Sequence, residues 1–181
     1  MLKNAQLTNF EIFSGLAPDK LETIAQAGEI KEFEENDIIF HEDEAADRLY
    51  GVLDGEVELS IVFKDKILKA VPLKDIKYEE ENLSRIEVLE RPIVVDTIAP
   101  GEVFGWSSAV SPGMRTATAR CARASKVISV PGARLKTICD KDPALGYVIM
   151  GKLSEVISRR LQKRTDTLVE AWGQAFGVDR T

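Results

Sequence analysis

The sequence is poor in the side chains that bind metal ions or act as nucleophiles. His41 is the only histidine, and the two cysteines, Cys121 and Cys139, lack the C-x-x-C spacing of zinc and disulfide-exchange sites. We therefore expect no metal site and no Cys–His nucleophile. Cys121 falls in phase with Ala117 and Ala119, which indicates a buried, unreactive thiol.

Sequence motifs of catalysis are also missing. The chain contains no G-x-S-x-G nucleophile elbow, no H-E-x-x-H zinc motif and no phosphate-binding P-loop. We therefore expect a protein that is not an enzyme and that requires no cofactor.

Long apolar runs and an excess of basic residues are absent as well. No run is long enough to span a membrane, and the first residues, MLKNAQLTNFEIF, lack the pattern of a signal peptide. This predicts a cytoplasmic protein with no membrane partner. The net charge is −6, whereas a general nucleic-acid binder presents a basic surface. A length of 181 residues suits one domain with an appendage.

What the sequence does contain is a stretch of glycine and small residues followed by an arginine, GEVFGWSSAVSPGMRTATA at residues 101–119. Gly105 permits a backbone conformation, or a close approach, that a Cβ atom would forbid. Ser107 and Ser108 begin about one helical turn, whose free N–H groups favour an anion. Arg115 offers a planar fork that grips phosphate with two hydrogen bonds. Together these residues predict a small phosphate site.

This stretch, called the cassette below, resembles the phosphate-binding cassette of the cyclic nucleotide-binding domains found in catabolite-activator-type regulators and protein kinase A regulatory subunits. Phe104-Gly105 matches the start of the family's F-G-E, and residues 115–118 match its R-[ST/A]-A-T. Trp106 replaces the glutamate that accepts a hydrogen bond from the ribose 2′-hydroxyl in the family.

The resemblance implies a site for a cyclic nucleotide or another phosphate-bearing ligand. Its candidate residues are Phe104, Gly105, Trp106, Ser107, Ser108, Arg115, Thr116 and Ala117. The alternative is a scaffold turn in which Arg115 pairs with an acidic neighbour and binds no ligand.

The residues before the cassette change from a helical to a strand pattern. Residues 10–28 are typical of a helix, with Pro18 in its first turn and Gly28 at its end. From Glu29 the period shortens towards two, and residues 49–63 alternate around Asp54-Gly55, which predicts a tight hairpin at that dipeptide. This segment is also similar to the family pattern, with Asp43 where the family usually has glycine; the matching residues are Glu42, Ala46, Asp47, Leu49, Tyr50, Val52 and Gly55.

Residues 64–97 are longer than the connection between two strands of a β-roll needs to be. They carry the acidic cluster Glu79-Glu80-Glu81. We interpret them as an inserted, solvated hairpin arm, and an arm that binds a partner is the alternative.

The carboxy-terminal part predicts one long helix that begins at Asp142-Pro143 and keeps apolar residues at helical spacing from Leu145 to Trp172. An apolar stripe that extends beyond the β domain formed by the preceding residues needs a second helix to bury it. In the family the matching helix pairs with its two-fold mate, so we expect a homodimer through this helix. The basic residues of the helix are interpreted as a solvated face; they are Lys152, Arg159, Arg160, Lys163 and Arg164.

The fold that these patterns and the resemblance imply is mainly β with flanking helices: a double-stranded β-helix (jelly-roll, cupin-like) of the cyclic nucleotide-binding type. Residues 1–140 are assigned to the roll, with the arm at 64–97, and residues 141–176 to the long helix.

The function implied is a small-ligand sensor that signals through its carboxy-terminal helix. A ligand-free interaction module of the same fold and a Crp/Fnr-type transcriptional regulator are the alternatives. The chain stops near Phe176, where transcription factors of this family begin a winged helix-turn-helix, so we do not expect DNA binding by this chain alone.

Overall fold

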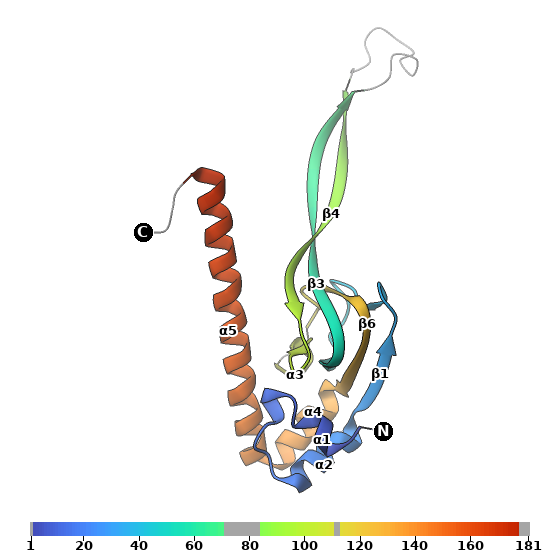
Figure 1. Cartoon of the computed structure of the whole chain (residues 1–181), viewed down its shortest axis with the longest axis vertical. Coiled ribbons are helices and arrows are strands. Elements are labelled where there is room, and N and C mark those ends of the chain that lie inside the picture. The colour runs from blue at the N-terminus through green and yellow to red at the C-terminus, as the bar shows by residue number, and fades with distance from the viewer. Residues whose placement is uncertain (1, 71–83, 111–112, 178–181) are drawn as a thin grey trace.

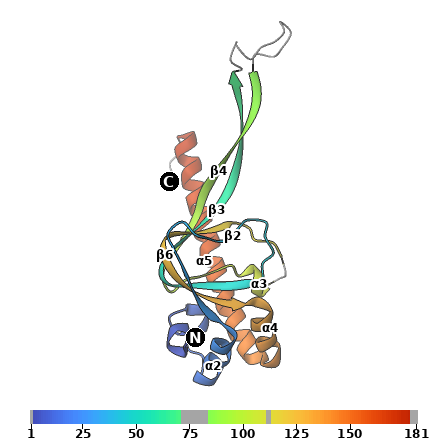
Figure 2. The same cartoon turned by 90° about the vertical axis from the view of Figure 1, so that its right-hand side faces the viewer.

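The computed structural model describes residues 2–70, 84–110 and 113–177. The strands form a roll, and short helices gather at one end of it (Figure 1). A two-stranded ribbon projects from the opposite end, and the last helix runs along the side of the roll and past it (Figures 1 and 2). The cluster Glu79-Glu80-Glu81 lies outside the described residues.

The amino-terminal segment forms three short helices: α1 (Asn4–Leu7), the 3-10 turn η1 (Glu11–Phe13) and α2 (Pro18–Ala27). The single helical segment predicted at residues 10–28 is divided because Gly15 has a φ of 75°. Pro18 begins α2 and Gly28 ends it, as predicted.

The roll is one antiparallel sheet of six strands, ordered β1-β6-β3-β4, in which β2 also pairs with β6 and β5 with β3. The strands are β1 (Glu29–Phe33), β2 (Ile38–Phe40), β3 (Arg48–Ala70), β4 (Ser84–Ile98), β5 (Val103–Phe104) and β6 (Thr118–Pro131). This architecture confirms the predicted mainly β class and roll. Cys121 is fully buried within it, and burial raises the pKa of its thiol, as expected of an unreactive cysteine.

The hairpin predicted at Asp54-Gly55 is wrong. Both residues lie inside β3, a single strand of 23 residues. Gly55 has a φ of 93°, and the pairing of β3 with β6 shifts register on both sides of Glu56. The dipeptide therefore makes a bulge that bends one strand, since a glycine at positive φ is equally suited to a turn and to a bulge.

The far halves of β3 and β4 form the projecting ribbon, defined here as residues 61–70 and 84–93. There β3 pairs only with β4, from Ile61↔Ile93 to Ala70↔Ser84. The segment 64–97 interpreted as one arm is therefore divided, because its last residues belong to the roll. Val95 packs against the core of the roll and Asp96 is buried.

Helix α4 (Gly132–Lys141) follows β6 and leads into α5 (Pro143–Phe176), a helix of 34 residues. The carboxylate of Asp142 caps α5 by accepting a hydrogen bond from the Leu145 amide at 3.1 Å. No helix in the described part of the chain is both long and apolar enough to cross a membrane.

The apolar stripe of α5 is divided into two parts. Its first half packs against the amino-terminal helices, α4 and the outer face of the roll through Leu145, Ile149, Leu153 and Val156. Its second half leaves apolar side chains exposed, namely Leu161, Leu168, Trp172 and Phe176. Leu153 is thus a core residue of the protomer and is not available to a dimer interface.

Candidate functional site

The cassette contains β5 and turns sharply at Gly105. This glycine has a φ of 72°, and an added Cβ atom would lie 2.7 Å from the Arg115 Nη1 atom and 3.1 Å from the Arg48 carbonyl oxygen. Both the predicted conformation and the predicted close approach are therefore present. Helix α3 (Ser107–Val110) follows, while Ser111 and Pro112 lie outside the described residues.

Helix α3 is a single turn, and it uses its own N–H groups. The amide of Ser108 donates to the Gly105 carbonyl oxygen, and the amides of Ala109 and Val110 donate to that of Trp106. Three of the four amides of α3 are therefore used within the turn, and the prediction of a cluster of free donors is wrong for these three.

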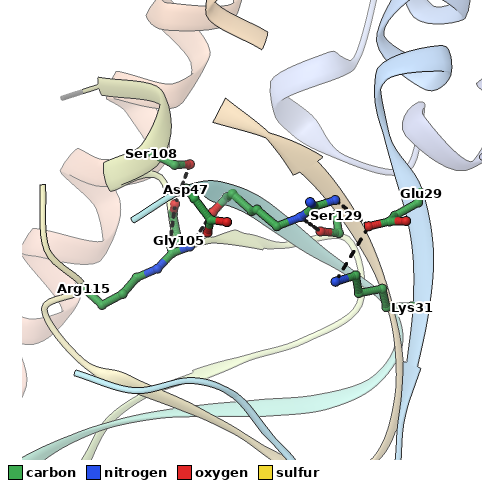
Figure 3. A network of polar contacts seen from close by, with 8 residues as sticks. Glu29, Lys31, Asp47, Gly105, Ser108, Arg115 and Ser129 are labelled. Atoms are coloured by element: carbon green, nitrogen blue, oxygen red, sulfur yellow. Dashed lines mark hydrogen bonds and ion pairs between the residues drawn. The ribbon is translucent and has the colours of Figure 1, made fainter. Parts of the chain in front are cut away.

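Arg115 is the central side chain of the cassette and is only 3% exposed. Its Nη1 atom donates to the Gly105 carbonyl oxygen at 3.0 Å, and its Nη2 atom donates to the Arg48 carbonyl oxygen at 3.0 Å and to the Asp47 carboxylate at 3.3 Å. Figure 3 shows the guanidinium reaching between Gly105 and Asp47. The buried Nε atom has no hydrogen-bond partner among the described residues.

An aromatic cluster in the core of the roll supports this arginine. The guanidinium carbon lies 4.2 Å from the ring centroid of Phe40 and 5.7 Å from that of Tyr50. Tyr50 stacks on Phe104 with ring centroids 5.3 Å apart. Burial lowers the pKa of Arg115, and Tyr50 and Asp47 oppose that effect. Because an arginine keeps its proton in proteins, the result is a fixed positive charge at the cassette.

A chain of polar contacts links the cassette to the first strand. Arg48, whose carbonyl oxygen accepts from Arg115, uses its own side chain to donate to Ser129 and to Glu29, each at 2.5 Å. The Ser108 hydroxyl donates to the Gly105 carbonyl oxygen at 3.1 Å in the same network. Gly105 and Arg115 are therefore held by contacts that extend to several strands.

Trp106 occupies the position of the glutamate in the family's cassette and faces α5. The guanidinium of Arg160 lies 4.8 Å from the centre of the Trp106 ring. This contact is a cation–π interaction. Helix α5 therefore contacts the cassette through the residue that distinguishes it from the family pattern.

The basic residues of α5 form the expected solvated face only in part: Arg159 and Lys163 are exposed, whereas Arg160 is buried. Arg160 is 7% exposed, and its Nε atom lies 3.5 Å from the carboxylate of Asp96, which is itself buried. Lys163 lies 3.3 Å and Arg164 3.9 Å from the same carboxylate. Three cations of α5 thus surround one carboxylate of β4. We call these four residues the Asp96 cluster.

A cavity of about 40 Å³ lies at the cassette. Six of the eight predicted site residues line it: Gly105, Trp106, Ser107, Arg115, Thr116 and Ala117. Phe104 lies in the core of the roll, and Ser108 is bonded to Gly105. Three further lining residues were missed from the sequence, namely Phe40, Leu59 and Arg164. The arginine could not be identified because only the fold brings α5 to the cassette.

A larger cavity, of about 140 Å³, lies between η1, the β4–β5 turn and α5. Its charged lining residues are balanced in sign: Glu11, Asp96 and Glu102 against Arg159, Arg160 and Lys163. Arg159 pairs with Glu11, and Arg160 lies between Asp96 and Glu102. Because its acidic and basic residues pair with one another, we interpret this cavity as part of the packing interface between α5 and the roll.

No protein-family model and no curated protein sequence matches the chain. Solved structures do. A Geobacter metallireducens protein assigned to the cyclic nucleotide-binding proteins is 28% identical, with a TM-score of 0.67, over 89% of this chain and 99% of that one. The catabolite activator protein of Thermus thermophilus is 20% identical, with a TM-score of 0.60, over 90% of this chain and 63% of that one.

The regulatory domain of Toxoplasma gondii PKA, solved with cAMP, is also similar. It is 20% identical with a TM-score of 0.52, over 75% of this chain and 42% of that one. These matches agree with the resemblance carried by the cassette.

Proposed function

Given that the chain has the fold of the cyclic nucleotide-binding domains, we propose that it is a regulatory sensor domain whose cassette binds a phosphate-like anion and whose α5 passes the signal to a partner. In this proposal the chain binds and signals, and it catalyses no reaction. Similar domains in the comparison carry cAMP or are regulators, which supports the sensor role.

The observation that carries the proposal is the state of Arg115. Its guanidinium is positioned by three oxygen atoms and two aromatic rings, yet its buried Nε atom has no partner. A buried donor without a partner costs about 1–3 kcal/mol. An anion accepting from this Nε atom would recover that energy.

We propose no hydrogen bond to a ribose 2′-hydroxyl group, the contact that the glutamate makes in the family's cassette. Trp106 carries only an N–H donor and cannot accept a hydrogen bond from a 2′-hydroxyl group. A hydrogen bond to a charged group contributes about 1.5–3 kcal/mol, so the loss weakens a cyclic nucleotide by roughly ten- to a hundredfold relative to a site that has the glutamate. The ligand is thus selected by its phosphate more than by its ribose.

Signalling through α5 is supported by its contacts with the cassette. Arg160 stacks on Trp106, and Arg164 lines the cassette cavity. A ligand that changes the position of Trp106 therefore acts directly on the second half of α5.

Tryptophan fluorescence tests this function. Trp172 is exposed, so Trp172→Phe leaves Trp106 as the only reporter without disturbing the core. Titration with inorganic phosphate, cAMP and cGMP should give a saturable change in fluorescence that Arg115→Gln removes. Arg115→Lys, which keeps the charge but loses the planar fork, serves if the glutamine variant does not fold, and it should bind more weakly. The absence of a saturable response to all three compounds would contradict the proposal.

A ligand-free module of the same fold is the second candidate. It is favoured by the cavity of about 40 Å³, which is far below the 300–1,000 Å³ of ordinary ligand pockets. In that case Arg115 serves the structure alone, and Arg115→Lys should lower stability without any change in response to anions.

We also propose that two copies pair through the second half of α5. The stripe Leu161, Leu168, Trp172 and Phe176 is apolar and exposed, and a second copy offers an identical stripe. Sedimentation should give a dimer for the natural chain and a monomer for Leu168→Glu. Thr167→Glu, which adds the same charge at an exposed position outside the stripe, should stay dimeric. A natural chain that sediments as a monomer would contradict pairing.

A further inference from the structure

The cassette cavity has an unusual charge composition. Two of its nine lining residues are arginines, Arg115 from the roll and Arg164 from α5, and none carries a carboxylate. The larger cavity beside it has as many carboxylates as cations. An excess of positive charge without acidic neighbours in the lining is the condition under which a buried space favours an anion.

Both arginines have a donor that the protein leaves unused. The Nε atoms of Arg115 and Arg164 are buried, and neither has a hydrogen-bond partner among the described residues. The remaining contacts of each arginine lie elsewhere: Nη2 of Arg115 contacts Asp47, and Nη2 of Arg164 lies 3.9 Å from Asp96. The acids therefore hold the two guanidinium groups in place and leave both buried Nε atoms without a partner.

The size of the cavity limits what it can hold. A volume of about 40 Å³ accommodates roughly three water molecules, or one group of a few heavy atoms. Trp106 and Leu59 line the same space, so the cavity matches the size of a phosphate group better than that of a whole nucleotide.

We propose that the ligand is a small inorganic oxyanion of the size of phosphate or sulfate, bound between Arg115 and Arg164. This inference rests on the proposed function of the cassette and adds a second anion-binding residue, contributed by α5. The site is complete only when α5 lies on the roll. An anion that binds both arginines therefore favours the docked position of the helix by the same factor by which docking favours the anion.

A pair of neighbouring substitutions tests the role of Arg164. Arg164→Gln removes a cation from both the Asp96 cluster and the cassette cavity. Lys163→Gln removes a cation from the Asp96 cluster alone, because Lys163 does not line the cassette cavity. Phosphate and sulfate titrations at constant ionic strength, followed by Trp106 fluorescence and calorimetry, should show affinity reduced about tenfold or more by Arg164→Gln and less than about twofold by Lys163→Gln.

Three outcomes would overturn the inference. Equal phosphate affinities for Arg164→Gln and Lys163→Gln would show that Arg164 does not bind the anion, while the proposed function stands if Arg115→Gln still abolishes binding. Binding of cAMP more tightly than phosphate would show that the cavity opens to a whole nucleotide. No anion binding by the natural chain would remove both the inference and the proposed function.

Hydrogen exchange supplies a readout on the helix itself. Saturating phosphate should slow amide exchange in α5 from Arg160 to Thr167 in the natural chain and in Lys163→Gln, and should leave Arg164→Gln unchanged. Protection confined to the cassette in all three proteins would also overturn the contribution of α5.

Discussion

The two halves of α5 are attached to the protein by different forces. From Pro143 to Val156 the helix buries leucine, isoleucine and valine side chains in a continuous apolar core. From Arg160 onward it contacts the roll through the Asp96 cluster and the Trp106 stack, and its apolar side chains face outward. A single uninterrupted helix thus joins a fixed anchor to a segment held by charge.

This difference matters because the two kinds of attachment respond to different conditions. At moderate salt, apolar burial changes little with ionic strength, whereas charge contacts that reach solvent are screened by salt and respond to bound anions. The second half of α5 is therefore the part of the helix that a ligand at the cassette can influence.

The largest expected effect comes from breaking the apolar anchor. Leu153→Ala should reduce the free energy of unfolding by about 2–5 kcal/mol, because it leaves a cavity in a fully buried site. Leu168→Ala, which truncates the same side chain in the exposed half, should change the stability of the monomer by less than about 0.5 kcal/mol. Denaturant unfolding at a low, fixed protein concentration measures both, and equal losses would refute the division of the helix.

The next effect comes from the charged attachment. Asp96→Asn removes the carboxylate that three cations share and leaves the buried Arg160 with only the more distant, half-exposed Glu102. The loss of a partner from a buried ion pair costs about 3–5 kcal/mol, and we expect the lower end because Lys163 and Arg164 are partly solvated. Glu102→Gln is the matched control, since Glu102 is half-exposed and lies 3.9 Å from Arg160. Similar stability of the two variants would argue against the Asp96 cluster as an attachment.

A smaller effect concerns the start of the anchored half and depends on pH. The Lys20 ammonium, 2.8 Å away, and the Leu145 amide lower the pKa of Asp142 below its ordinary value near 3.8. The folded chain then binds this proton less readily than the unfolded chain does. The contribution of Asp142 to stability is therefore complete above the ordinary pKa and is lost as the pH falls through the folded one. Between about pH 5 and pH 2 the melting temperature should fall more steeply for the natural chain than for Asp142→Asn; parallel curves would exclude this cap.

The smallest effect is expected for the ribbon, which projects beyond the roll as the second half of α5 does. Replacement of residues 65–89 by Asn-Gly keeps the Lys64↔Glu90 pair and retains Val95 and Asp96. Because loop length changes the entropy of the unfolded chain only slightly, the melting temperature should stay within a few degrees. A larger fall, or an insoluble product, would mean that the ribbon stabilises the fold.

Much of the fold could be predicted from short patterns. Gly105, Arg115 and the alternation that follows identified the cassette, and Asp142-Pro143 identified the start of α5. These signals are local, because each reflects the backbone conformation or the capping of the residue that carries it. Asp54-Gly55 shows the limit of such signals, since the same backbone requirement arises at a turn and at a bulge.

The extent of the site could not be predicted, since it depends on contacts between distant segments. Arg160 and Arg164 occur among charged residues at helical spacing, a pattern typical of a solvated face. The burial of Arg160 and the partial burial of Arg164 accompany their contacts with Asp96, which lies on a strand that we assigned from the sequence to an exposed arm. Neither the arginines of α5 nor Asp96 of β4 can be recognised in the sequence as partners, because only the fold brings them together.

The length of β3 has a consequence for the order in which the chain folds. Its far end pairs with β4 at Ala70↔Ser84, close in sequence, whereas its near end pairs with β6 at Arg48↔Pro131, far away in sequence. Contacts between near residues close a small loop and form sooner than contacts between distant ones. The ribbon can therefore nucleate early and set the alignment of β3 and β4 before β6 arrives. The ribbon would then raise the rate of folding although it adds little to equilibrium stability, because β6 pairs with a β3 strand that is already aligned.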